Sequence, residues 1–177
     1  IQAGPPSKIL FYGNEEAYAD VLEGMELLKD GASADEFFAW LSQELGRRQA
    51  ERKADADAAL TPIYIFIDGY RAFFDAISQQ TVSRLRALLL AGAGLGVSLI
   101  AADDAETLAT LVSYMEPVTM LLAKGPAVLL GGKPLDHMAV ESGLTAVEKN
   151  QPFKQYEGLY KWDSRVCRFK AMDSQSS

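Results

Sequence analysis

The feature that most constrains this chain is an unbroken apolar run of strand length, from Ile63 to Ile67, which ends in the carboxylate of Asp68. Consecutive isoleucine and aromatic residues predict a strand that is buried on both faces, as is typical of a parallel sheet. In open α/β sheets, ligands bind beyond the carboxyl ends of such strands. Asp68 therefore stands where a carboxylate that holds Mg²⁺ or accepts phosphate would stand, although a capping or turn aspartate fits the local sequence equally well.

The rest of the pattern alternates strands with helices and predicts an α/β fold with a mainly parallel sheet and a C-terminal β-hairpin. We expect strands at 8–12, 97–102, 118–122 and 127–130, and a hairpin from 156–162 and 166–171. We expect helices from Asn14 to a stop at Gly31, from a capping box of Ser33 and Glu36, over 81–91, and from Asp103 or Asp104 to Pro117. One domain should cover residues 1–172, followed by a disordered tail at 173–177.

Charge and composition argue against several classes of function. The net charge of −7 and the isoelectric point near 4.8 argue against a domain that grips nucleic acid, because that requires a positive surface. His137 is the single histidine and has no cysteine or second histidine at ligand spacing, so we predict no metal site. Cys167, the single cysteine, is expected in the core of the hairpin, and the basic residues around it on a solvated face. No run of about 18 apolar residues predicts a membrane span.

Two glycine-containing segments do not form a phosphate cradle. Gly92, Gly94 and Gly96 follow a helix and precede a strand, the reverse of a dinucleotide-binding fingerprint, so we expect a helix C-cap and a tight turn. The chain contains no G-x-x-x-x-G-K-[ST] motif. The nearest fragment, at residues 3–8, has the wrong spacing and runs into a strand. The sequence therefore predicts no cofactor held by this chain alone.

The order of several segments resembles one known family. A helix with Leu41-Ser42-Gln43-Glu44-Leu45-Gly46-Arg47-Arg48 precedes a charged linker and the strand ending in Asp68, and Phe73-Phe74, Gly94-Leu95-Gly96, Leu129-Leu130-Gly131-Gly132 and Glu157-Gly158-Leu159-Tyr160 follow in turn. Over roughly residues 33–171 this set is similar to the last ATPase-like module of FtsK/SpoIIIE family motors of type VII secretion, the EssC or YukB type. The resemblance implies a P-loop NTPase-like fold of the RecA/FtsK type.

What the resemblance implies about function is limited by two departures. Asp68 matches the aspartate of the second nucleotide-binding motif and is the one candidate cofactor-binding residue, a vestigial Mg or nucleotide site. Gly69 replaces the acid that normally follows and orients water, and the phosphate-binding loop has no match, because it was lost or lay before Ile1. We therefore expect a degenerate module without catalytic residues or enzyme activity of its own, in which Mg-ATP would bind only to a complete module.

The same resemblance implies a place and partners. The module would lie on the cytoplasmic side of the bacterial membrane within a membrane-anchored parent. It would contact neighbouring ATPase modules and secreted helical-hairpin proteins rather than DNA. Two alternatives stay open: a truncated but genuine ATP-binding domain, and a receiver-like domain with Asp68 as phosphoacceptor and Lys124 after a later strand. Against the receiver stand Ala101 and Ala102, where a hydroxyl is needed, and two successive helices before the Asp68 strand.

Overall fold

A computed structural model describes residues 7–20, 22–110, 117–136, 144–162 and 165–170. The chain folds as two compact units, residues 1–104 and 105–177, and each is described by itself. The prediction of a single module over residues 1–172 stays a prediction, and the expected tail at 173–177 lies outside the described residues.

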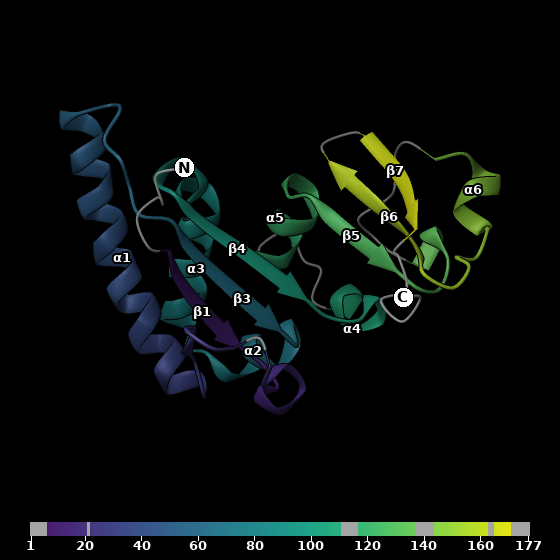
Figure 1. The fold of residues 1–177 in the computed structure, drawn as a ribbon, viewed down its shortest axis with the longest axis horizontal. Helices are drawn as coiled ribbons and strands as arrows, with labels where there is room; N and C mark the ends of the chain where they lie inside the picture. The colour runs from purple at the N-terminus through teal and green to yellow at the C-terminus, as the bar shows by residue number, and fades with distance from the viewer. Residues whose placement is uncertain (1–6, 21, 111–116, 137–143, 163–164, 171–177) are drawn as a thin grey trace. The chain divides into compact units, whose positions relative to one another are not determined.

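The first unit is built on a parallel sheet. Its strands are β1 (Lys8–Tyr12), β2 (Glu26–Leu27), β3 (Ile63–Asp68) and β4 (Val97–Ala102), in the order β2-β1-β3-β4. The helices that connect them are α1 (Gly31–Ala54), α2 (Tyr70–Ala76) and α3 (Gln79–Ala91), with short 3₁₀ turns η1 (Glu15–Tyr18) and η2 (Ala93–Leu95). In Figure 1 the arrowheads of β1, β3 and β4 all point to the same edge of the sheet.

The helices pack on one face of this sheet. Ile63, Ile65 and Ile67 are at most 2% exposed and point to that face, where Phe73 of α2 meets the ring of Tyr12 at 5.1 Å between centroids. The alternate residues of β3, Tyr64, Phe66 and Asp68, are only half-buried. The expected burial of β3 on both faces is therefore wrong for the described structure, because the described helices of the first unit cover only one side of the sheet.

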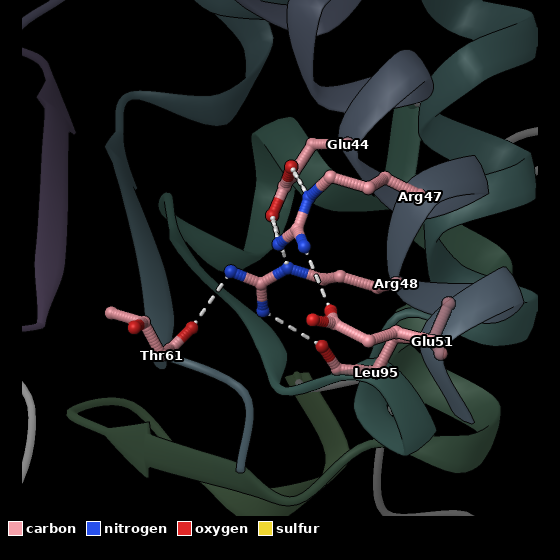
Figure 2. Close-up of polar contacts among 6 residues, drawn as sticks. All are labelled: Glu44, Arg47, Arg48, Glu51, Thr61 and Leu95. Carbon is pink, nitrogen blue, oxygen red and sulfur yellow. Dashed lines mark hydrogen bonds and ion pairs between the residues drawn. The ribbon is translucent and has the colours of Figure 1, made fainter. Parts of the chain in front are cut away.

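A buried arginine fixes α1 against the starts of two strands. Arg48 is 3% exposed, and its guanidinium pairs with Glu44 one turn earlier at 2.7 Å. The same group donates to the carbonyl oxygens of Thr61, just before β3, and of Leu95, just before β4, at 2.7 and 2.8 Å (Figure 2). A charge buried this deeply requires such complete pairing. Arg48 thereby joins α1 to the segments that lead into β3 and β4.

The second unit holds a small antiparallel sheet. Its strands are β5 (Ala127–Leu130), β6 (Glu157–Trp162) and β7 (Arg165–Lys170), in the order β5-β6-β7. Its helices are α4 (Ala105–Thr110), α5 (Pro117–Lys124) and α6 (Ala146–Asn150), with a 3₁₀ turn η3 (Pro134–Asp136). Leu129 and Leu159 form its buried core, against which Leu122, Ala127, Leu144, Phe153 and Val166 pack.

The fold class is confirmed: an α/β protein with a parallel four-stranded sheet flanked by helices, and a separate antiparallel sheet that contains the terminal hairpin. The turn from Gly92 to Gly96 is also confirmed. Gly92 caps the end of α3, and Gly96 adopts a left-handed backbone with φ 72°.

The expected first helix is wrong. Among the described residues between Asn14 and Gly31, only η1 is helical, and β2 follows it and pairs in parallel with β1. Gly24, with φ 81°, interrupts the segment between them. Gly31 does not end a helix but begins α1, because Asp30 is the N-cap and accepts a hydrogen bond from the backbone N–H of Ser33. Ser33 is therefore the third helical residue rather than the cap.

Three further expectations are corrected in the second half of the chain. Residues 118–122 lie in the helix α5 rather than in a strand. Cys167 is exposed rather than in the core, because it lies on the sheet face opposite to Leu129 and Leu159. Lys161, expected on a solvated face, is buried and donates from Nζ to the carbonyl oxygen of Leu122 at 2.6 Å.

Candidate functional site

The carboxyl ends of β1, β3 and β4 meet at one edge of the parallel sheet. Asp68 is the last residue of β3 and pairs in register with Ala102, the last residue of β4. Tyr12 ends β1 opposite Ile67, and Gly13 follows. The structure therefore places Asp68 where the sequence predicts it, at the edge where parallel sheets bind ligands.

Gly13 allows the end of β1 to approach Asp68 closely. A Cβ atom at Gly13 would lie 2.8 Å from the Cβ of Asp68 and 3.2 Å from its carbonyl oxygen. Both neighbours belong to the backbone or are fixed to it, so neither can swing away. Only glycine fits at residue 13 while β3 ends where it does.

Gly69 has a conformational role of its own. Its backbone is left-handed, with φ 77° and ψ 59°, and it turns the chain from β3 directly into α2. A Cβ atom there would meet nothing within 4 Å, so space is available for a side chain. The backbone conformation disfavours one, since a left-handed residue other than glycine costs about 1–2 kcal/mol. An acid at this position would have to adopt that conformation or change the turn.

Tyr18 contacts the candidate carboxylate from η1. Its ring packs edge-on against Phe11, at 5.3 Å between centroids, and Phe11 pairs with Phe66 on the same sheet face as Asp68. The negative charge of Asp68 and a hydrogen bond from the Tyr18 hydroxyl to its carboxylate raise the pKa of Tyr18 above its usual value. The sequence pattern gave no sign of this proximity, since it predicted one continuous helix from Asn14 to Gly31.

Asp103 serves as a cap for a different helix from the one expected. Its carboxylate accepts hydrogen bonds from the backbone N–H of Arg71, in the first turn of α2, at 2.7 Å, and from that of Asp104 at 2.8 Å. Asp103 therefore fixes the start of α2 beside the end of β4. The anion-attracting first turn of α2 already has a carboxylate of the chain itself.

These residues do not by themselves fit Mg-ATP. Asp68 is one carboxylate of the kind that Mg²⁺ prefers, but Asp103 is engaged by two backbone N–H groups. Within the ranges that the structure describes, no three His, Cys, Asp or Glu side chains gather closely enough to hold a metal ion. The chain also has no motif to cradle phosphates. His137 lies outside the described residues.

A hollow of about 500 Å³ lies elsewhere in the first unit, on α1 and the turn before β4. Gln49, Arg52, Ala56, Ala91, Gly94 and Leu95 line it. It is beside the Arg48 contacts and includes none of the residues at the carboxyl ends of the strands. Asp68 does not line this hollow. Its assignment to a nucleotide site therefore stays a prediction.

Comparison with solved structures identifies the fold. The chain is similar to EssC (ATPases 2 and 3) from Geobacillus thermodenitrificans, with a TM-score of 0.72 and 13% identity over 94% of this chain and 31% of that one. It is also similar to EccC (ATPases 2 and 3) from Thermomonospora curvata, whose structure holds a signal sequence peptide, with a TM-score of 0.71 and 14% identity over 96% and 31%.

A third similar structure is the cytoplasmic domain of the type VII secretion ATPase EccC from Thermomonospora curvata, with a TM-score of 0.69 and 14% identity over 97% of this chain and 20% of that one. The chain thus spans less than a third of each of these proteins. No protein-family model matches it, and no curated protein matches it in sequence. Among the described residues, no helix is long and apolar enough to cross a membrane. The chain therefore shares the fold of the EssC and EccC ATPase modules.

Proposed function

We propose that this chain is a degenerate module of an FtsK/SpoIIIE-like type VII secretion motor. It acts through contact with neighbouring ATPase modules, or by regulating them, and does not hydrolyse ATP itself. As part of a membrane-anchored parent it would lie on the cytoplasmic side, and secreted helical-hairpin proteins are a second class of partner. The fold it shares with EssC and EccC supports the placement in a motor.

The observation that carries the proposal is the pair Asp68 and Gly69. The carboxylate stands at the end of β3, but the next residue is a glycine in a left-handed backbone that only a few per cent of residues with a side chain adopt. The water-orienting acid is thus replaced by a residue that the turn itself requires.

The second candidate is a genuine ATP-binding domain of which this chain is a part. It is favoured by the position of Asp68, half-buried at the edge where three parallel strands end. In this case, a phosphate loop upstream of Ile1 would supply the cradle. The receiver-like alternative loses support, because Lys124 ends the helix α5 instead of following a strand. The argument from two successive helices before the Asp68 strand no longer counts against a receiver, because the strand β2 lies between η1 and α1.

Calorimetric titration of Mg-ATP separates the candidates. We would titrate this chain, and a longer version that extends upstream of Ile1, each as wild type and as Asp68→Ala. The degenerate module predicts no binding heat from either length. Asp57→Ala is the matched control, since Asp57 is an exposed carboxylate in the loop after α1.

Two outcomes would contradict the proposal. Binding by the longer version, lost in Asp68→Ala and kept in Asp57→Ala, would establish the second candidate. ATP hydrolysis by the longer version at about 1 s⁻¹ or faster, the lower range of typical enzymes, would do so as well if Asp68→Ala abolished it.

A further inference from the structure

The antiparallel sheet of the second unit has an apolar outer face. Residues directly opposite each other on paired strands share a face, so Val128 lies with Tyr160, Gly158 with Leu130 and Phe169, and Trp162 with Arg165. We call this set the outer face; its residues are Val128, Leu130, Gly158, Tyr160, Trp162, Arg165, Cys167 and Phe169.

The core of the unit lies on the other side. Leu129 and Leu159, 7% and 0% exposed, point to the inner face, where α5 contributes Leu122. On the outer face Val128 is 60% exposed, Leu130 62% and Trp162 56%. An antiparallel sheet with one packed face normally presents polar residues on the other. Apolar residues gathered on the exposed face mark an interaction surface.

Close packing gives the outer face a defined shape. A Cβ atom at Gly158 would lie 2.7 Å from Cζ of Phe169 and 2.9 Å from Cδ2 of Leu130, so these two side chains converge over the glycine. Tyr160 and Trp162 contact each other edge to face, at 6.3 Å between centroids. Aromatic side chains held in this way are the usual anchors of protein interfaces.

The outer face carries one cation and no carboxylate. Arg165 lies opposite Trp162 and is exposed, and the described residues contain no ion-pair partner for it. The one cation of β6, Lys161, lies on the inner side, where its Nζ donates a hydrogen bond to the carbonyl oxygen of Leu122. Arg168 of β7, also on the inner side, lies 3.9 Å from Glu157 and over the ring of Phe153. A partner that complements this face offers an apolar stripe with a carboxylate beside it.

Two other kinds of partner for this sheet, a second copy of the chain and an added strand, are disfavoured by charge. A second copy of this chain would bring the same outer face, with another Arg165 and no carboxylate to pair with it, which opposes self-association through this face. Strand addition at β7 is discouraged by Arg165, Arg168 and Lys170, the kind of charges that protect edge strands. On the inner face, Leu122 of the helix α5 packs against the core residues of the sheet.

We propose that the outer face binds an amphipathic helix of a partner protein, whose apolar stripe covers Leu130, Tyr160 and Trp162 and whose acidic side chain pairs with Arg165. The inference rests on the proposed role in protein contact and names its surface. It concerns no residue at the carboxyl ends of β1, β3 and β4, so the nucleotide titrations and the helix binding can fail independently.

The test uses a synthetic helix of about 18 residues, with leucines at i, i+3, i+4 and i+7 and glutamates between them. Binding is followed by the fluorescence of Trp162 in a Trp40→Phe background, since the chain has two tryptophans. We expect a solvent-like emission from the free protein and a saturable blue shift on binding. Cys167, also on the outer face, should react several-fold more slowly with a thiol reagent in the complex.

Charge reversal tests the pairing. Arg165→Glu should weaken binding of the glutamate helix about tenfold and should favour a lysine version of the same helix. Leu130→Ser should weaken both helices. Val147→Ser is the matched control, because Val147 is 79% exposed on α6 and lies outside the outer face. It should leave both affinities unchanged.

Three results would overturn the proposal. The first is a blue-shifted, quencher-protected Trp162 in the free protein, which would mean that the face is already covered. The second is equal binding of the glutamate and lysine helices by the wild type, or binding of neither. The third is concentration-dependent self-association that Trp162→Ser abolishes, which would assign the face to a second copy.

Discussion

At the scale of single residues, the contact between Tyr18 and Asp68 can be tested without any ligand. The carboxylate raises the pKa of the phenol because its charge opposes formation of the phenolate. Asp68→Asn removes that charge, so the pKa of Tyr18 should fall toward its usual value near 10. A carbon-13 NMR titration of ring-labelled tyrosine measures the change.

The matched control for this titration is Asp75→Asn. Asp75 lies on α2 and pairs with Arg71 at 2.7 Å, so its neutralisation should leave the pKa of Tyr18 unchanged. The pKa of Tyr12, which is raised mainly by burial, should not move in either variant. Equal titration of Tyr18 in the wild type and in Asp68→Asn would show that the two side chains do not meet.

Glu44 makes the stability of the first unit depend on pH. Its pKa is lowered from 4.5 to about 2, chiefly by hydrogen bonds from Arg47 and then from Arg48. A carboxyl group with a depressed folded-state pKa stabilises the protein fully above its unfolded value. That contribution is lost as the pH falls from about 4.5 to about 2. The full shift corresponds to about 3.4 kcal/mol at 1.36 kcal/mol per pH unit, and the loss should be nearer about 1 kcal/mol because Arg47 is 57% exposed and solvent screens its charge.

Urea unfolding at pH 7 and pH 3 measures this effect, with Trp40 on α1 as the probe in a Trp162→Phe background. Glu44→Gln should be less stable than its parent at pH 7, and it should lose less stability on acidification. Glu51→Gln is the control, because the Glu51 side chain is 45% exposed and pairs only with Arg47 in the described contacts. An acid response in Glu44→Gln identical to that of its parent would refute the assignment.

At the scale of elements, α1 is joined to the sheet by a polar contact as well as by its apolar side. Arg48→Met removes the two hydrogen bonds to the carbonyl oxygens of Thr61 and Leu95. Both oxygens then lose the donor that they have in the wild type. We expect a loss of about 3 kcal/mol in the free energy of unfolding. Arg47→Met is the neighbouring control: its side chain is 57% exposed, and we expect a loss under about 1 kcal/mol.

The same urea titration compares the two variants directly. Similar losses in Arg48→Met and Arg47→Met would mean that the buried contacts of Arg48 contribute no more than a surface ion pair. Hydrogen exchange adds a local measure, since amides at the starts of β3 and β4 should lose protection in Arg48→Met and keep it in Arg47→Met.

Elements with a strong period or a clear turn residue could be predicted from the sequence. β3, β4, α3 and the hairpin of β6 and β7 are examples. The region after Asn14 could not be predicted. Its apolar residues have helical spacing, but that spacing is also compatible with the short turn η1 and the two-residue strand β2. At residues 118–122, a short apolar run fits a strand and a helix equally. At the start of α1, both Asp30 with Ser33 and Ser33 with Glu36 have capping spacing.

The candidate site, too, could be predicted from the sequence only in part. The position of Asp68 follows from the strand it ends, which the sequence marks plainly. Tyr18 and Gly13 reach Asp68 only through the pairing of β1 with β3, which no local pattern records. Asp103 was expected to act within its own segment but caps α2, far away in the sequence.

At the scale of the whole molecule, the charge is unevenly distributed. All of the net negative charge comes from residues 1–104, because acidic and basic side chains balance in residues 105–177. The first unit is therefore the part that repels nucleic acid most strongly. The second unit carries the apolar outer face with its single cation, so the two units differ in the partners that their chemistry admits.

The close approach of Gly13 to Asp68 has a consequence for the history of such chains. Gly13 can gain a side chain only if the end of β3 moves first, because the Cβ and the carbonyl oxygen of residue 68 occupy the space. Packing alone is therefore enough to preserve the glycine across generations, but it requires no carboxylate at residue 68. Persistence of the glycine among relatives would be a record of how two strands touch, whereas persistence of the aspartate would need a separate cause.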